Sequence, residues 1–221
     1  KQSINYQPDK DPLTPEHSQY NRNIGIEYNL ASPGNFWTGK ALLLKSFSPH
    51  TSGRTVTHAA NLNYTDRKWL LGWQHEYVGR DYVAEVGYVP RTGYIKVNPQ
   101  LGYLFFAKTG KILSHGPVAQ STYYLNETFK KTDYETYLAY KFNFRNQATL
   151  NGLAAMNYVK LLRPFDPTNS GLDSLQTGTE HNWNNFSLEY ISSPRNLFTY
   201  SAYLSYGGYF AEGTRLQITN E

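Results

Sequence analysis

The sequence predicts an all-β chain folded as an antiparallel transmembrane β-barrel, and three observations lead to this fold class. Apolar and polar residues alternate in several runs of about ten residues, the length of a membrane-crossing strand. Aromatic residues make up 16% of the chain, yet the mean hydropathy is only −0.61. No stretch approaches the roughly 20 consecutive apolar residues of a membrane helix. In a membrane barrel only alternate residues face lipid, which reconciles the three observations.

Alternation with a period of two is clearest in five runs. In Lys68–Tyr77, for example, Trp69, Leu71 and Trp73 share one face. The other runs are Arg22–Leu30, Arg54–Tyr64, Tyr134–Phe144 and Phe198–Tyr206. Strands of soluble proteins are nearer to about five or six residues, so the length of these runs favours a membrane barrel. A soluble β-sandwich is the alternative.

The predicted organisation is a short linker followed by a single β-rich region. Residues 1–20 contain three prolines and read as a polar linker, and residues 21–221 form part of the barrel. We expect about twelve strands. The longest connection, 163–182, is predicted to be a long loop on the outer face. Because the chain stops at Glu221 without a terminal aromatic residue, we expect a fragment of a larger barrel.

Two segments do not alternate and bear on the choice between a membrane barrel and a soluble sandwich. Ala41–Leu44 and Gly102–Ala107 are apolar on both faces. A membrane barrel must place some of these side chains on the lumen side, whereas a soluble sandwich would bury them.

Candidate turns between the predicted strands lie at 65–67, 78–81, 145–147 and 193–196.

The densest polar cluster contains four candidate binding residues, Glu76, Arg80, Glu85 and Arg91. Two carboxylates suit glycoside hydrolysis when they flank one glycosidic bond. A turn at Val78–Asp81 would separate Glu76 from Glu85, so we predict a salt-bridge network in preference to a catalytic pair. Arg91 is expected either to place a charge at a constriction of the lumen or to pair with Glu85.

Trp183 is the fifth candidate binding residue. Together with Tyr123, Tyr124 and the asparagines around Trp183, it suits a glycan-binding surface made of rings and amides. The alternative is that these residues belong to an aromatic girdle at the membrane interface, with residues such as Trp37 and Tyr64 near the ends of runs.

The sequence predicts no metal site, no cofactor and no catalytic residue. His58, His75 and His115 lack the close spacing of a metal-binding pair. Neither a G-x-S-x-G elbow nor a phosphate-binding loop is present. The net charge is +4, but the cations are scattered along the chain, which is not typical of nucleic-acid binding. The absence of cysteine agrees with a protein of the cell envelope.

Two stretches carry a resemblance to a known family. The first reads NRNIGIEYNLASPGNFWTGKALLLKSFSP and the second QHEYVGRDYVAEVGYVPRTGY, in which the phrase from Val78 to Arg91 is the most specific. Residues 21–145 resemble an uncharacterised family of outer-membrane β-barrel proteins common in Bacteroidetes, whose members often carry an N-terminal carbohydrate-binding-module-like domain. Residues 146–221 match in general character. The resemblance implies a barrel and the bacterial outer membrane, and it implies no catalytic residue.

Three hypotheses of function follow. The first is an outer-membrane barrel with a transport, surface-binding or scaffolding role, for which a link to glycan handling is considered. Its partners would be outer-membrane lipid, lipopolysaccharide, other envelope proteins and glycans. The second is an envelope enzyme that acts on glycans through carboxylates in the lumen, which the sequence does not favour. The third is a soluble carbohydrate-binding β-domain.

Overall fold

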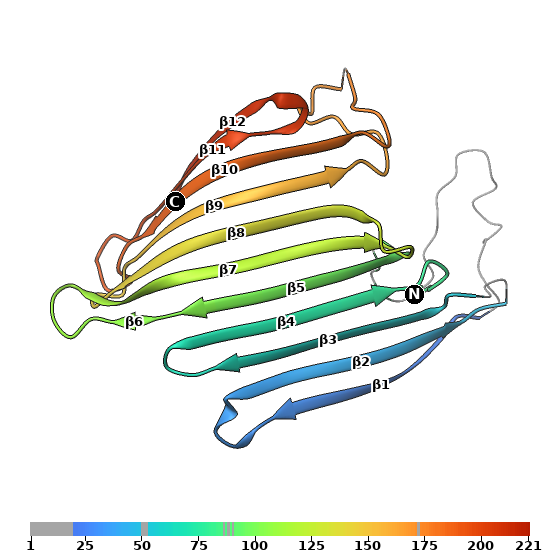
Figure 1. Ribbon diagram of the computed structural model, residues 1–221, viewed down its shortest axis with the longest axis horizontal. Coiled ribbons are helices and arrows are strands. Elements are labelled where there is room, and N and C mark those ends of the chain that lie inside the picture. Colours follow the sequence, from blue (N-terminus) through green and yellow to red (C-terminus); the bar gives the residue numbers. More distant parts are fainter. Residues whose placement is uncertain (1–19, 50–52, 86, 88, 90, 172) are drawn as a thin grey trace.

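The computed structural model describes residues 20–49, 53–85, 87, 89, 91–171 and 173–221, so nearly all of the predicted linker lies outside the described residues. The strands form one antiparallel sheet in which each strand pairs with the next along the chain (Figure 1). A short strand, β6 (Phe105–Phe106), pairs beside the main path with β7. The strands of the main path are β1 (Arg22–Ala31), β2 (Trp37–Phe47), β3 (Val56–Thr65), β4 (Trp69–Val78), β5 (Tyr94–Tyr103), β7 (Ile112–Asn126), β8 (Lys131–Phe144), β9 (Thr149–Lys160), β10 (Glu180–Ile191), β11 (Ser201–Gly208) and β12 (Thr214–Asn220).

The expected all-β fold and a twelve-stranded antiparallel sheet are confirmed in the described residues, whereas a closed barrel is not seen there. β1 and β12 lie at the two ends of the strand order and do not pair with each other in that part of the chain. Two 3-10 turns, η1 (Pro33–Asn35) and η2 (Phe210–Glu212), accompany the strands. The described part of the chain contains no helix of the length and hydropathy needed to cross a membrane.

Asparagine and aspartate side chains close the tight turns between strands. Between β3 and β4, the Asp66 carboxylate accepts hydrogen bonds of 2.6 Å from the backbone N–H groups of Lys68 and Trp69. Between β7 and β8, the Asn126 amide oxygen accepts from the N–H groups of Thr128 and Lys130. Such short polar side chains satisfy turn donors that the sheet leaves unpaired.

The pairing register separates apolar from polar side chains across the whole sheet. One row of directly paired residues, the apolar row, runs through ten strands: Trp37, Tyr64, Leu71, Leu101, Ala119, Leu138, Ala154, Phe186, Tyr206 and Leu216. The adjacent row, the polar row, consists of Thr38, Asn63, Gly72, Gln100, Gln120, Tyr137, Ala155, Asn185, Gly207 and Arg215. Because successive side chains of a strand point to opposite faces, the two rows define an apolar face and a polar face.

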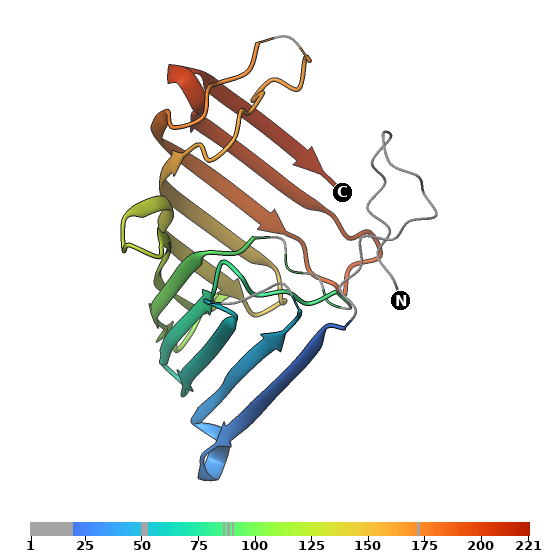
Figure 2. The same cartoon turned by 90° about the vertical axis from the view of Figure 1, so that its right-hand side faces the viewer.

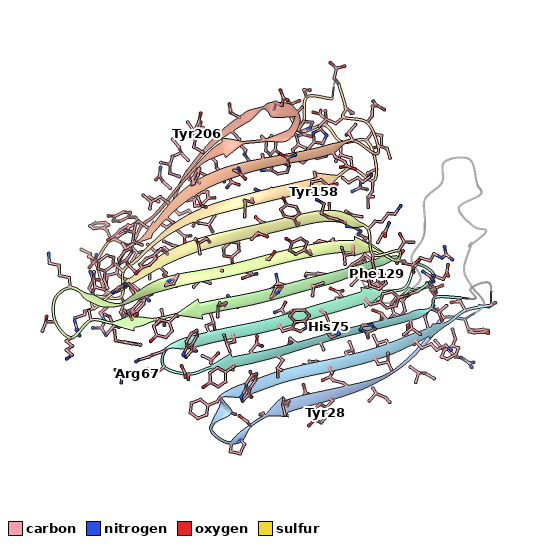
Figure 3. All side chains as sticks on the ribbon, viewed as in Figure 1. Tyr28, Arg67, His75, Phe129, Tyr158 and Tyr206 are labelled. Atoms are coloured by element: carbon pink, nitrogen blue, oxygen red, sulfur yellow. The ribbon has the colours of Figure 1, made fainter. Side chains whose placement is uncertain are left out.

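The apolar face is largely uncovered from β1 to β12. Ile26 in β1 is 73% exposed, Phe186 in β10 is 65% exposed and Ile218 in β12 is 64% exposed. Tyr28, His75 and Tyr206, which are labelled in Figure 3, also belong to this face by their register. Tyr158, labelled as well, lies on the same face but is buried, with the Lys131 ammonium 3.6 Å from its ring centroid. Contiguous apolar surface of this extent marks a surface that meets a membrane or a partner.

The sheet curves into a trough, with β1 and β12 at its two rims (Figure 2). Along β10, the residues of the polar face are less exposed than their neighbours on the apolar face. Side chains converge on the inside of a curved sheet, so this alternation places the polar face on the concave side. The apolar face is therefore the outside of the trough.

The two ends of the strands carry connections of different length. One end, the long-loop end, has the connections 48–55, 79–93, 127–130, 161–179 and 209–213. The other, the short-turn end, has the connections 32–36, 66–68, 104–111, 145–148 and 192–200. In Figure 1 the short-turn end lies on the left and the long-loop end on the right. The longest connection spans 161–179, close to the expected loop at 163–182.

Contacts distant in sequence decide where some elements begin and end. The turn expected at 78–81 is present, since the Tyr82 N–H donates to the Gly79 carbonyl at 3.1 Å, but it opens the longer connection 79–93. Tyr82 of this connection packs with Val78 and Tyr94, and Leu44 of the polar face packs against that cluster. This contact explains why Leu44 is apolar although it lies on the polar face. Phe198, expected to begin a strand, lies in the connection that precedes β11.

Two strand glycines give a matched test of the close packing between β5 and β7. A Cβ at Gly116 would meet the carbonyl oxygen of Tyr103, whereas a Cβ at Gly152 would meet nothing within 4 Å. We expect Gly116→Ala to destabilise the folded chain by about 1–3 kcal/mol because the backbone must shift. Gly152→Ala is expected to stay within about 0.5 kcal/mol of the unaltered chain. Urea midpoints of the refolded chain measure both, and equal midpoints would contradict the packing described.

Candidate functional site

The polar face is hollowed over β2 to β5, and the hollow has a volume of about 220 Å³. Its polar lining includes Lys40, Asn61, Gln74, Glu76 and Lys96 of the polar face, and His75 borders it as well. Glu76 accepts a hydrogen bond of 2.8 Å from the Tyr94 hydroxyl, and Lys40 pairs with Glu27 at 2.9 Å. The hollow therefore presents ammonium, carboxylate and amide groups together, and these groups hydrogen-bond polar solutes.

The two carboxylates considered as a catalytic pair have separate surroundings. Glu76 lies on β4 within the hollow and is held by Tyr94. Glu85 lies in the connection between β4 and β5, where its backbone N–H donates to the Asn21 side chain at 3.5 Å. The structure gives the two residues different supporting elements, and the hollow includes only Glu76.

Arg91 ties the connection 79–93 to the start of β8. Its guanidinium donates to Asp133 and to the Thr132 hydroxyl, both at 3.0 Å. The same group lies 5.5 Å from the ring centroid of Tyr94 and 5.4 Å from that of Tyr124. An arginine fork that pairs with a carboxylate and stacks on two rings is a fixed element. Its carboxylate partner is Asp133, whereas the sequence suggested Glu85.

Arg80 belongs to an ion-pair network at the long-loop end. Its guanidinium lies 4.0 Å from Glu127 and 3.7 Å from Asp81. Arg54 pairs with the same Glu127 carboxylate at 2.6 Å, and its backbone N–H donates to Asp81 at 3.0 Å. The Glu127 side chain is only 12% exposed. A network of this kind joins three connections of the long-loop end and agrees with the salt-bridge interpretation of this sequence region.

Trp183 lies on β10, away from the other four candidates, in an aromatic cluster that sequence reasoning did not find. Its ring is 4.7 Å from the ring of Phe210 and 6.1 Å from the ring of Tyr209. The ring of Phe165, from the connection 161–179, lies 4.9 Å from the ring of Phe210 in a tilted arrangement, and His181 also contacts Phe210. The cluster joins two connections whose residues are far apart in sequence, so no local pattern could have revealed it.

A second hollow of about 400 Å³ lies beside this aromatic cluster. It is lined by Glu180, His181, Asn182, Ala211 and Glu212. The backbone N–H of Ala211 donates to His181 at 3.4 Å. The two carboxylates and the amide offer hydrogen-bonding groups beside the partly exposed rings of the aromatic cluster.

The three central histidines do not form a metal site. His58 and His75 lie on the apolar face with their ring centroids 5.3 Å apart, and His115 bonds to the Tyr140 hydroxyl at 2.7 Å. Within the described ranges, no group of three or more His, Cys, Asp or Glu side chains is arranged to hold a metal ion.

Asp166 organises the connection 161–179. Its carboxylate accepts hydrogen bonds from the hydroxyl and N–H of Thr168 and from the N–H of Gly171, at 2.7–2.8 Å. These bonds, above all that from the Thr168 hydroxyl, lower the pKa of Asp166 to about 2. The ionised carboxylate therefore fixes the shape of this part of the connection.

Arg91 is expected to stabilise the folded chain through Asp133. A double-mutant cycle of Arg91→Ala and Asp133→Asn should give a coupling of about 0.5–1 kcal/mol, because the pair is mostly shielded from water. The matched control is the more exposed pair Lys160 and Glu180, for which a smaller coupling is expected. A coupling at Arg91 no larger than that of the control pair would show that the fork does not fix the connection.

The order of the connection 161–179 should depend on pH through Asp166. Because the folded pKa is depressed, the stabilisation is complete above the ordinary carboxyl pKa of 3.8 and is lost as the pH falls through about 2. Hydrogen exchange at the Gly171 amide measures this loss directly. Asp166→Ala should speed this exchange at neutral pH, and Asp173→Ala in the same connection is the control that should not. Equal exchange in both variants would refute the role of Asp166.

Comparison of the chain with family models, with curated proteins and with solved structures found no match.

Proposed function

We propose that this chain forms part of the wall of a β-barrel in the bacterial outer membrane. The observation that carries the proposal is the separation of an apolar row and a polar row over ten paired strands of one curved sheet. The apolar outer face would contact hydrocarbon, and the concave polar face would line an aqueous lumen.

A single sheet with one uncovered apolar face supports a membrane-embedded wall in preference to a soluble β-sandwich. In a sandwich, a second sheet packs on the apolar face at about 10 Å. The described residues form one sheet, and its outward side chains, such as Leu138 and Phe186, remain 60% and 65% exposed. Hydrocarbon is the solvent that makes such a surface stable, and the strand pairing satisfies the backbone groups between the edges. A closed wall also requires partners for the edges of β1 and β12.

The proposed role is passage or binding of polar solutes on the lumen side. The hollow over β2 to β5 supports it, because Lys40, Lys96 and Glu76 lie there beside amide side chains. Charged and amide groups that line a pore select solutes by charge and hydrogen bonding. The resemblance of residues 21–145 to outer-membrane barrels of Bacteroidetes points the same way.

A surface-binding role linked to glycans is the second candidate function. The observation that favours it is the aromatic cluster of Trp183 and Phe210 beside the hollow with Glu180 and Glu212. In the proposed orientation the long-loop end faces outward, since long connections of outer-membrane barrels lie on the outer face. The cluster would then be open to the medium.

Adjacent residues of β10 provide the test of the membrane environment. Phe186→Arg places a charge on the apolar face near the middle of the strand and should cost about 2–4 kcal/mol in a bilayer. Ser187→Arg places the same charge on the polar face and should be tolerated. The fraction of chain that folds into lipid vesicles, read from heat-modifiable migration in electrophoresis, compares the two. Equal folding of both variants would contradict the proposal.

A further inference from the structure

The short-turn end collects positive charge that is scattered in the sequence. Six exposed cations lie in four of its connections: Arg67, Lys68, Lys108, Lys111, Arg145 and Arg195. The only carboxylate within those four connections, all of them described, is Asp66. Asp66 already accepts hydrogen bonds from two backbone N–H groups of its own turn. These four connections therefore carry a net charge of +5, whereas the whole chain carries +4.

Direct contacts join these connections into one continuous band. The Leu104 N–H donates to the Lys68 carbonyl at 2.7 Å, which links the connections 66–68 and 104–111. The Arg145 guanidinium donates to the Lys108 carbonyl at 3.2 Å. Ser193 donates to the Asn146 carbonyl at 2.5 Å, which brings the connection 192–200 to its neighbour. The six cations therefore form one surface, which we call the basic band.

Aromatic and apolar side chains lie directly beside the basic band. Trp37 and Trp69 begin β2 and β4 at this end and belong to the apolar face. The Arg67 guanidinium lies 4.8 Å from the ring centroid of Phe106. In the connection that contains Arg195, Leu197 is 93% exposed and Phe198 is 81% exposed. The cations of the basic band and these apolar side chains are therefore exposed next to one another at the short-turn end.

We propose that the basic band binds the phosphate headgroups of anionic glycerophospholipids in the leaflet at the short-turn end, an inference that rests on the proposed membrane function. Phosphate neutralises the cations, and the adjoining acyl region covers the rings and the apolar tip of Leu197 and Phe198. A soluble polyanion would neutralise the charge and leave those apolar side chains in water. The lipid interface is therefore the partner that fits both parts of the surface.

Tryptophan quenching tests the proposal at the position of the band. In a Trp73→Phe, Trp183→Phe background, only Trp37 and Trp69 report, and both lie at the short-turn end. The chain is reconstituted in phosphatidylcholine vesicles with an equal mole fraction of dibrominated phosphatidylglycerol or dibrominated phosphatidylcholine. We expect stronger quenching by the brominated phosphatidylglycerol and a smaller difference at high salt, which screens the attraction.

Charge-removing variants assign the preference to the band. Lys108→Gln with Lys111→Gln should lower the preference for phosphatidylglycerol by about 30-fold, because each of the two lost cations contributes about fivefold at an anionic lipid surface. Lys130→Gln with Arg163→Gln removes the same charge at the long-loop end and is the matched control, which should keep the preference. A preference that falls equally in the control would overturn the assignment.

The remaining outcomes separate this inference from the proposed function. Equal quenching by the two brominated lipids overturns the headgroup site and leaves the membrane wall intact. No quenching by either lipid overturns the proposed function itself. Equal quenching together with polyphosphate binding in neutral detergent, lost in the Lys108→Gln, Lys111→Gln variant, would assign the band to a soluble polyanion and reject the lipid.

Discussion

The antiparallel register of the sheet is the constraint on which the rest of the structure depends. Most strands alternate apolar and polar residues, and pairing aligns the apolar side of each such strand with that of its neighbour. A shift by one residue would turn the side chains of that strand to the opposite face. With the register kept, one layer of backbone carries a hydrocarbon-like surface on its outside and a polar surface on its inside. This division places the hollow that contains Lys40, Glu76 and Lys96 on the inside of the sheet.

Much of the fold could be predicted from the sequence because alternation is a local property. The alternating runs that contain Ile26, Leu71 and Leu138 predict strands that the structure has. The number of strand-like segments in the sequence predicts the number of strands. Curvature and the connection 79–93 depend on contacts between distant residues, which no local period reports. Leu44 is apolar on the polar face because Val78, Tyr82 and Tyr94 gather next to it.

The sequence allowed the candidate residues themselves to be predicted, but not the partners that they contact in the structure. Arg80 and Arg91 stand out as charges in a short segment, yet their partners Glu127 and Asp133 are 47 and 42 residues away. Antiparallel strands return the chain to the same end of the sheet at every second connection. This connectivity brings together the residues of the Trp183–Phe210 cluster and those of the basic band, which are far apart in sequence. Charges that look scattered along the sequence are therefore gathered by the topology.

Site-directed spin labelling along β10 tests the central division of faces most directly, and the absence of cysteine allows one label at a time. In lipid vesicles, labels at even positions from Asn182 to Tyr190 should collide mainly with dissolved oxygen. Those at odd positions from Trp183 to Glu189 should collide mainly with a water-soluble nickel chelate. Even positions that are reached by nickel as readily as the odd ones, or that are shielded from both reagents as in a packed sandwich, would contradict the account.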